Sequence, residues 1–251
     1  VDFQFALDPE GEALQVAEKA RKQGKRMLLI APNTEWGIRM SKTYKEIWQD
    51  MNGSIAAVIS FDPKATNYSA LIKASLNIDR SFSRRNLLRN LIDSNIEFVA
   101  RRRKDIDIII LAASGAQARQ ILPQLRFHQA ENIPIFASSH VFSDFGSDTN
   151  NRDLEGLNFG DAPWVTSEEN YFLRKTLRDT DHPAKDYPRL FAFGRDAYGI
   201  LPFLKKMEES PYLRIPGDTG NLWIDADRII QRDLKWFRFK NGKPREKDFS
   251  S

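Results

Sequence analysis

DIDIIILAASGAQARQILPQLRFHQAENIPIFASSH, residues 105–140, is the stretch of sequence that decides the fold. Two short apolar runs, 106–112 and 133–137, flank a segment at 116–130 whose apolar residues recur at helical spacing. Apolar runs without polar alternation are typical of strands covered on both faces, as in parallel sheets. A strand, a helix and a second strand in this order predict a βαβ crossover.

The same alternation continues towards the N-terminus. Helices are predicted from Asp8 to Gly24, from Thr34 to Asn52 and over 67–76, because apolar residues recur every three or four positions. Apolar runs at 26–31 and 54–61 predict the strands between them. The fold class is therefore α/β, with a parallel, doubly wound sheet.

Two segments interrupt this alternation. Residues 79–104 are polar and basic, and they predict a surface helix with charged flanks. Residues 143–152, rich in Ser, Asp, Asn and Gly, predict a loop. Pro123 and Pro202 lie inside otherwise helical patterns, so a kink or a restart is expected at each.

The pattern changes beyond the predicted loop. Residues 154–165 read as an extended segment, and 168–178 and 188–207 read as helices. Residues 221–239 predict two strands that end at a turn, Asn241–Gly242.

Composition excludes several protein classes. The 251 residues are 41% hydrophobic and contain no cysteine, which excludes a disordered chain and a disulfide scaffold. The net charge of +4 is too small to indicate a nucleic-acid partner. The basic run Arg101–Lys104 is expected to be the solvated start of a strand, with one cation in a salt bridge.

The longest apolar run, Ile108–Ala113, is too short for a membrane helix. Because the chain opens with Val1, it is expected to be a processed form or a piece of a longer protein.

The run Ser138–His140, with Asp161, supplies the residue types of a hydrolase triad. The run is flanked by alanine and valine, however, and not by the glycines of a nucleophile elbow. We therefore expect local hydrogen bonds or one wall of a crevice, and no enzymatic activity.

Metal and cofactor sites are not expected. The three histidines, His128, His140 and His182, are distant from one another in sequence, and no cysteine accompanies them. Ser114–Gly115 after a predicted strand is expected to be an ordinary turn into a helix, and the sequence has no glycine-rich dinucleotide motif and no P-loop.

Ligands of parallel sheets lie beyond the carboxyl ends of the strands. Polar and mostly uncharged residues follow the predicted strands, and they suit hydrogen-bonding recognition better than acid–base chemistry. The residues expected to line an interlobe crevice are Asn33, Thr34, Asp62, Ser114, Ser138, Ser139 and His140.

Four long stretches resemble a known family. They are residues 105–140 quoted above, DLEGLNFGDAPWV at 153–165, RLFAFGRDAYGILPFL at 189–204, and GDTGNLWIDADRIIQRDLKWFRFKNGKP at 217–244. They are similar to the LppC/LpoA family of penicillin-binding-protein activator lipoproteins, and the likeness runs over nearly the whole chain.

This resemblance implies a type I periplasmic-binding-protein fold, in which crossing strands join two α/β lobes. It implies the carboxyl-terminal half of an outer-membrane lipoprotein that faces the periplasm. Members of the family bind the bifunctional penicillin-binding protein 1A and stimulate its peptidoglycan synthesis without being enzymes. The alternative function is a periplasmic receptor for small molecules of the amino-acid type, which would bind in the interlobe crevice.

Compared with the family, the chain starts at a strand, 3–7, that crosses into the second lobe. We assign 3–165 to the second lobe, 166–232 to returning elements of the first lobe, and 233–251 to a crossing strand and tail. The early strands of the first lobe, the helical amino-terminal region and the lipid-bearing cysteine are absent from this sequence. The predicted helices at 168–178 and 188–207 then lack the sheet they would cover, so we expect an oligomer, a swapped arrangement, or first-lobe sequence outside this chain.

Overall fold

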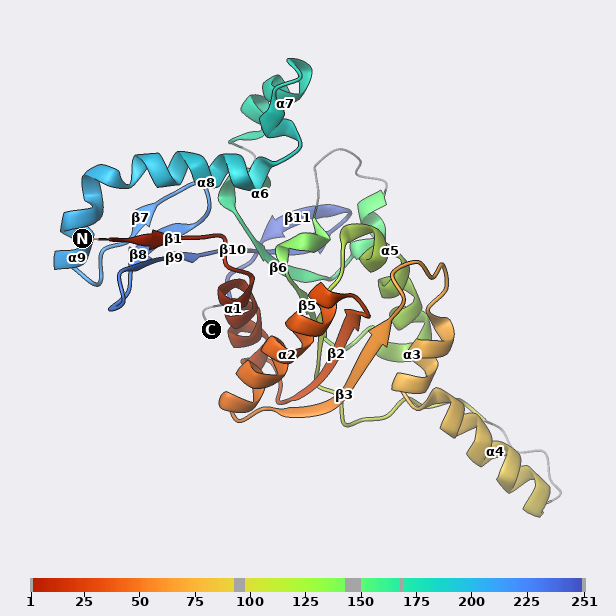
Figure 1. Cartoon of the computed structure of the whole chain (residues 1–251). Helices are drawn as coiled ribbons and strands as arrows, with labels where there is room; N and C mark the ends of the chain where they lie inside the picture. The colour runs from red at the N-terminus through yellow and green to blue at the C-terminus, as the bar shows by residue number, and fades with distance from the viewer. Residues whose placement is uncertain (1, 93–97, 143–149, 168, 250–251) are drawn as a thin grey trace. The chain divides into compact units, whose positions relative to one another are not determined.

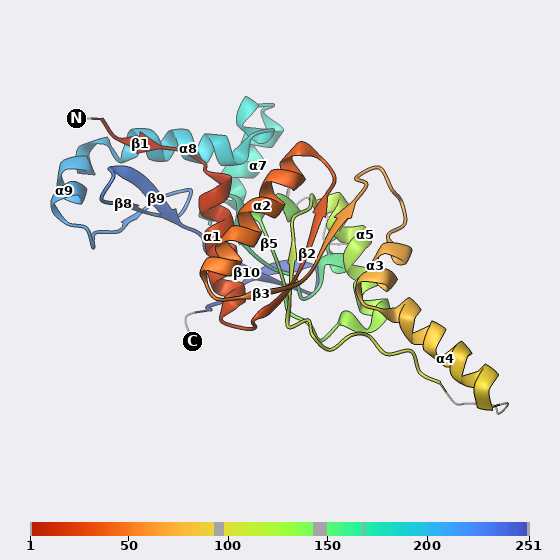
Figure 2. The same ribbon diagram turned by 60° about the horizontal axis from the view of Figure 1, so that its bottom comes forward.

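The structure, a computed structural model, describes residues 2–92, 98–142, 150–167 and 169–249 (Figures 1 and 2). The chain divides into two compact units. Unit 1 comprises Val1–Gln15, Gly160–Phe237 and Glu246–Ser251, and unit 2 comprises Val16–Phe159 and Arg238–Arg245. The predicted domain bounds at 165 and 232 stay a prediction.

The main sheet confirms the predicted α/β class. Its strands are β2 (Arg26–Pro32), β3 (Ser54–Phe61), β4 (Ile108–Leu111), β5 (Ile135–Ala137), β6 (Asn158–Asp161), β10 (Lys235–Lys240) and β11 (Lys243–Glu246). They lie in the order β11-β10-β6-β5-β4-β2-β3. The pairs β2–β3, β2–β4, β4–β5 and β5–β6 are parallel.

Helices cover both faces of this sheet in unit 2. Helix α2 (Glu35–Asp50) packs on β2 and β3, and α3 (Ser69–Ser75) and α5 (Gly115–Leu125) lie on the other side (Figures 1 and 2). Every side chain of β4 is buried, as its unbroken apolar sequence requires. Trp48 of α2 is fully buried, and its indole N–H donates to the carbonyls of Lys25 and Ser54.

Residue types that the local backbone requires set the ends of α2. The Thr34 side chain caps α2 by accepting from the N–H of Gly37 at 3.2 Å. Gly37 is needed there because a Cβ would lie 2.0 Å from the carbonyl oxygen of Pro32. The helix stops before Asn52, whose φ of 57° lies in the left-handed region.

The structure of unit 2 differs from the prediction at Pro123, and it describes only the end of the predicted loop at 143–152. Helix α5 continues through Pro123, and the irregularity comes later, in a π-helical turn at Arg126–Ala130 where Gln129 has a φ of 65°. The predicted loop at 143–152 lies mostly outside the described residues, and its last residues belong to a 3-10 helix, Asn150–Leu154.

Unit 1 contains a four-stranded sheet in the order β1-β9-β8-β7. Its strands are β1 (Gln4–Phe5), β7 (Ile215–Pro216), β8 (Asn221–Ile224) and β9 (Ile229–Asp233), and its helices include α6 (Pro163–Thr166), α7 (Tyr171–Asp179), α8 (Pro188–Gly199) and α9 (Leu204–Glu209). Helix α1 (Pro9–Arg21) and strand β6 each run from one unit into the other. The core of the small sheet holds Ile200, Met207, Leu222, Ile224 and Ile230.

Three expectations are tested in unit 1. The helix restarts at Pro202, as predicted, because a 3-10 turn at Leu201–Phe203 separates α8 from α9. The extended reading of 154–165 is wrong at its end, since Pro163 opens α6 and its fixed φ suits the first helical turn. Three strands, and not two, fill 221–239, because a turn at Arg228 (φ 62°) and a break at Leu234 divide the stretch. None of the helices in the described residues is both long enough and apolar enough to cross a membrane.

Candidate functional site

The structure places the predicted crevice residues at one edge of the sheet of unit 2. The parallel pairing brings together the carboxyl ends of β2, β4 and β5, and the residues that follow these strands lie there. Asn33, Thr34, Asp62, Ser114 and His140 are exposed, whereas Ser138 and Ser139 are buried. Whether a ligand binds at this edge stays a prediction.

Several of the predicted hydrogen-bonding groups already have structural partners. Ser114 forms a capping box with Gln117, in which each side chain is hydrogen-bonded to the backbone N–H of the other. Thr34 caps α2 in a similar way, and the Asp62 carboxylate accepts from the N–H of Lys64 at 2.9 Å. These groups stabilise helix starts and turns, and each of the Thr34, Ser114 and Asp62 side chains accepts one backbone hydrogen bond.

Ser138 and His140 form a hydrogen bond, Oγ to Nδ1, at 3.3 Å. The two residues are neighbours in a 3-10 turn, Ser139–Val141, and its N-cap. A triad needs a carboxylate that orients the imidazole. The carboxylate considered for this role, Asp161, instead accepts from Arg189 and from the N–H of Ala162. The contact is therefore a local one, and these residues do not form the triad that their residue types alone would allow.

Sequence reasoning did not place Trp36 at this edge. Its half-buried ring lies 5.1 Å from the ring of His140, measured between centroids. The position in the first turn of α2, just after Thr34, is a signal that was available, because that turn starts at the carboxyl end of β2.

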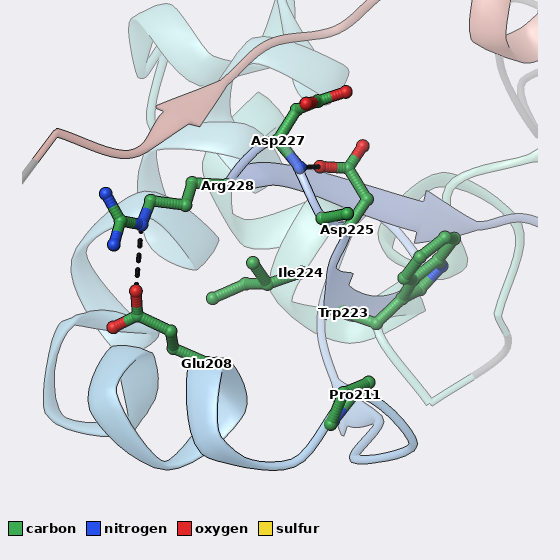
Figure 3. Close-up of a pocket in the computed structure, with 8 residues that line it drawn as sticks. Glu208, Pro211, Trp223, Ile224, Asp225, Asp227 and Arg228 are labelled. Carbon is green, nitrogen blue, oxygen red and sulfur yellow. Dashed lines mark hydrogen bonds and ion pairs between the residues drawn. The ribbon is translucent and has the colours of Figure 1, made fainter.

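A depression that the sequence did not reveal lies in unit 1 beside the turn between β8 and β9 (Figure 3). It has a volume of about 540 Å³, and its wall includes Trp223, Ile224 and Pro211. The Arg228 Nε donates to Glu208 at 2.8 Å and closes one side, as Figure 3 shows.

The polar groups around this depression mainly satisfy one another. The Asp225 carboxylate accepts from the N–H groups of Asp227 and Ile229 and from the side chain of Gln231. These bonds hold the turn between the strands. The arrangement gives the depression a structural role, and it does not bring a nucleophile and a base together.

Two buried carboxylates in unit 1 stabilise the fold. Asp161, which is 1% exposed, binds both the Nε and the Nη2 of Arg189, at 2.8 and 2.6 Å. Burial alone would lower the pKa of Arg189, but the charge and hydrogen bonds of Asp161 outweigh burial and raise this pKa. Asp196 accepts from the N–H groups of Asp218 and Thr219 and from the Thr219 hydroxyl.

The histidines and acidic residues that the structure describes are the candidate metal ligands of this chain. No group of three or more His, Cys, Asp or Glu side chains gathers as metal ligands in the described part of the chain. His128 is buried and its Nε2 lies 3.0 Å from the hydroxyl of Ser69. Burial and the charge of Lys73 lower the pKa of His128.

The basic run Arg101–Lys104 lies beside β4, as expected. Arg103 pairs with Asp105 at 2.5 Å, and the same hydrogen bond raises the pKa of Arg103. Arg102 donates to the carbonyls of Arg103 and Gln129. Arg102 and Arg103 therefore stabilise the backbone where the chain returns to the sheet.

Large apolar side chains are exposed on two groups of helices. In unit 1, the side chains exposed on α7, on α8 and on the segments beside them are Tyr171, Phe172, Leu173, Tyr187, Leu190, Tyr198, Leu201 and Phe203. In unit 2, those on α4 (Ile78–Ile92) are Phe82, Leu87, Leu88 and Leu91. Exposed apolar surface of this extent is typical of protein–protein contact sites.

Curated relatives match most of the chain. Penicillin-binding protein activator LpoA of Photobacterium profundum is 27% identical over 239 residues, which cover 94% of this chain and 38% of the relative. The protein of the same name from Aliivibrio fischeri is 28% identical over 236 residues, which cover 92% of this chain and 39% of the relative. The chain thus spans about two fifths of the length of these relatives.

Solved structures share the fold. The LpoA (YraM) C-domain from Haemophilus influenzae, a regulator of PBP1A, matches with a TM-score of 0.67 at 20% identity, covering 96% of this chain and 68% of that one. A putative branched-chain amino acid ABC transporter from Chromobacterium violaceum matches with a TM-score of 0.63 at 21% identity, covering 94% and 67%. These likenesses confirm the predicted periplasmic-binding-protein-like fold.

The family model described as "LppC putative lipoprotein" matches residues 2–242. That match reaches into both units and covers the four stretches on which the resemblance was based, except residues 243 and 244. The chain therefore belongs to the LppC family of putative lipoproteins.

Proposed function

We propose that this chain is a non-catalytic part of an envelope lipoprotein that binds penicillin-binding protein 1A and stimulates its peptidoglycan synthesis. Family membership over residues 2–242 supports this function, as do curated relatives named as activators of a penicillin-binding protein. The structural match to a domain described as a regulator of PBP1A points to the same partner.

The observation that carries the proposal is that the exposed helices present large apolar side chains, whereas the polar side chains at the sheet edge cap helices. At the edge, Thr34 and Ser114 cap helices. On the helices, apolar side chains such as Phe172 and Leu91 are 77% and 73% exposed. Exposed apolar surface is what protein recognition uses, and burying one such side chain contributes roughly 1.5–3 kcal/mol.

The test measures binding and activation together. The 251-residue chain is immobilised, and the periplasmic part of penicillin-binding protein 1A from the same bacterium is passed over it at micromolar concentration. The polymerisation rate of the synthase is then measured with and without the chain. We expect the chain to retain the synthase and to raise its polymerisation rate severalfold. As the matched control, a periplasmic amino-acid-binding protein of similar fold is immobilised in place of the chain. The proposal is refuted if the control retains the synthase as well as the chain does, or if the chain does not retain it.

The alternative function is a small-molecule receptor. The fold likeness to a putative branched-chain amino acid ABC transporter supports this alternative, and ligand binding tests it. A ligand at 100 times its dissociation constant adds about 2.7 kcal/mol to stability, which raises the melting temperature of a chain of this size by about 5–11 °C. We expect no such rise with a panel of amino acids and muropeptides, because the Thr34 and Ser114 hydroxyls are held in place by their roles as helix caps. A rise with one of them would favour the receptor.

For its location, we propose the periplasmic side of the outer membrane, with attachment through a lipid anchor carried outside this sequence. The family description as a putative lipoprotein supports this location. The test expresses the protein from its own gene, labels it with radioactive palmitate and separates the membranes on a sucrose gradient. Label in the outer-membrane fraction is expected, and an unlabelled protein in the soluble fraction would contradict the proposal.

A further inference from the structure

Helix α4 is an arm of unit 2 that begins on the core and then leaves it. It follows α3 and extends away from the sheet of unit 2 in both views (Figures 1 and 2). Its first turn is anchored, because Ile78 and Ser81 are buried and the Ser81 hydroxyl accepts from the N–H of Arg101. From Phe82 onwards, the described side chains of the helix are exposed, except that of Arg85, which is half-buried.

The exposed part of α4 is unusually apolar for a helix in water. Leu87, Leu88 and Leu91 are 63%, 46% and 73% exposed. With about 100° of rotation per residue, these three leucines fall within a sector of about 100° on the helix surface. A surface helix normally places polar residues there, so this sector is suited to contact with another molecule.

Two arginines extend the same sector towards the start of the helix. Arg80 and Arg84 precede Leu87 by seven and three residues, and that spacing places them in line with the leucines. In the part of the chain that the structure describes, neither arginine has an ion pair closer than 4.0 Å. We call the surface formed by Arg80, Arg84, Leu87, Leu88 and Leu91 the Arg–Leu face.

The remaining sides of α4 differ from this face. Phe82 is turned away from the leucines, and its ring lies 5.3 Å from that of Phe98 on the returning chain. Arg85 lies over the same ring at 5.5 Å. Asp79, Ser83 and Asn86 form a polar side. The contacts with the returning chain leave the Arg–Leu face uncovered.

The arrangement of charge favours a protein partner over a lipid surface. A helix that lies on an anionic membrane has its cations at the border of the apolar side or opposite to it. In α4, Arg85 and Arg89 lie outside the leucine sector, as on such a helix, but Arg80 and Arg84 lie within it. A flat hydrocarbon boundary that takes up the leucines would therefore have to take up Arg80 and Arg84 as well. A groove that is apolar at one end and lined by carboxylates at the other matches both halves of the face.

We propose that the Arg–Leu face of α4 is the surface on which this chain docks into such a groove of the penicillin-binding protein. This inference rests on the proposed function and adds the contact surface to it. The leucines provide the apolar contact, and the arginines fix orientation and make association depend on salt.

The test compares matched variants of the 251-residue chain. Leu87→Gln/Leu91→Gln removes the apolar half and keeps helix propensity, and Arg80→Gln/Arg84→Gln removes the charged half. The control, Ile38→Gln/Phe127→Gln, removes two side chains of unit 2 that are 63% and 83% exposed outside α4. All three should keep the wild-type circular dichroism and urea midpoint, because the changed side chains are exposed.

Binding to the periplasmic part of penicillin-binding protein 1A is measured by interferometry at 50 and 300 mM NaCl. We expect the leucine variant to bind at least 30-fold more weakly, the arginine variant to bind about tenfold more weakly with a reduced salt dependence, and the control to bind as the wild type does. Sedimentation with phosphatidylglycerol vesicles and the molar mass in solution are measured for the same proteins.

The outcomes separate this inference from the proposed function. If the wild type binds the synthase and the α4 variants bind equally well, the inference is wrong and the proposed function stands. If the wild type does not bind at all, both fail. Vesicle binding or dimerisation that depends on Leu87 and Leu91, with synthase binding unchanged, would assign the face to lipid or to a second copy and overturn the inference.

Discussion

The buried ion pair of Arg189 and Asp161 gives the sharpest test of the energetics of unit 1. Asp161 is 1% exposed and receives two hydrogen bonds from Arg189, whose side chain keeps 28% of its exposure. Arg189→Met removes the cation and leaves a buried carboxylate. Breaking a buried pair in this way costs about 3–5 kcal/mol. For a chain of this size, that loss lowers the melting temperature by about 6–20 °C.

The opposite substitution should cost less. Asp161→Asn removes the buried charge, and its side-chain oxygen still accepts from the N–H of Ala162, which now lies 2.7 Å from Oδ1. Arg189 keeps access to water, so the expected loss is about 1–3 kcal/mol, of the order of the hydrogen bonds removed. The double variant should be less destabilised than the sum of the two, because removing the second partner relieves the unpaired charge.

The assay is urea unfolding followed by circular dichroism at pH 7, with Glu208→Gln as the control. Glu208 pairs with Arg228 on the surface, where both side chains are more than a third exposed, so its loss should cost less than about 1 kcal/mol. The reasoning is refuted if Arg189→Met costs less than 1 kcal/mol, or if Asp161→Asn costs more than Arg189→Met.

Three further predictions concern pH and association. The Arg26 hydrogen bond lowers the pKa of Asp107 to about 2, so its contribution to stability is present above pH 3.8 and is lost as the pH falls towards 2; Asp107→Asn should flatten acid unfolding in that range and cost about 1 kcal/mol at pH 7, since solvent screens the pair. The pKa of His128 is lowered by burial, so stability should decrease as the pH falls below 6.5, and urea midpoints between pH 7.5 and 5 should lose this slope in His128→Gln; an unchanged slope contradicts the assignment. The exposed apolar face of α7 and α8 should make the isolated chain self-associate, so Leu190→Lys should shift the mass measured by light scattering towards the monomer; a wild type that is monomeric at 100 µM would count against this expectation.

The sequence was sufficient for features that depend on neighbouring residues. The buried run of β4 and the caps Thr34 and Ser114 are local signals, so strands and helices of the main sheet lie within a few residues of their predicted places. The rule that ligand sites lie beyond the carboxyl ends of parallel strands also placed the candidate residues at one edge. The capping box of Ser114 and Gln117 was readable from its spacing, although we predicted only a turn into a helix there and placed this serine in the crevice.

The sequence was not sufficient where distant segments meet. From the sequence, Asp161 was only a carboxylate of the type that a triad with Ser138 and His140 would need, and its actual partner, Arg189, lies 28 residues further along the chain. The depression beside the turn between β8 and β9 depends on the pairing of those strands and on Glu208 of α9, which no local pattern connects.

By itself, then, the sequence determined the α/β class, the order of the strands and helices along the chain and the family, because apolar spacing, caps and long ordered motifs are properties of contiguous residues. Only the tertiary structure decided which helix faces are covered and which distant side chains meet. Residues 79–104 were predicted to form a surface helix, and α4 confirms this, but the sequence did not show that Leu87, Leu88 and Leu91 all remain exposed on it. Burial depends on what packs against a helix, and its own sequence does not contain that information.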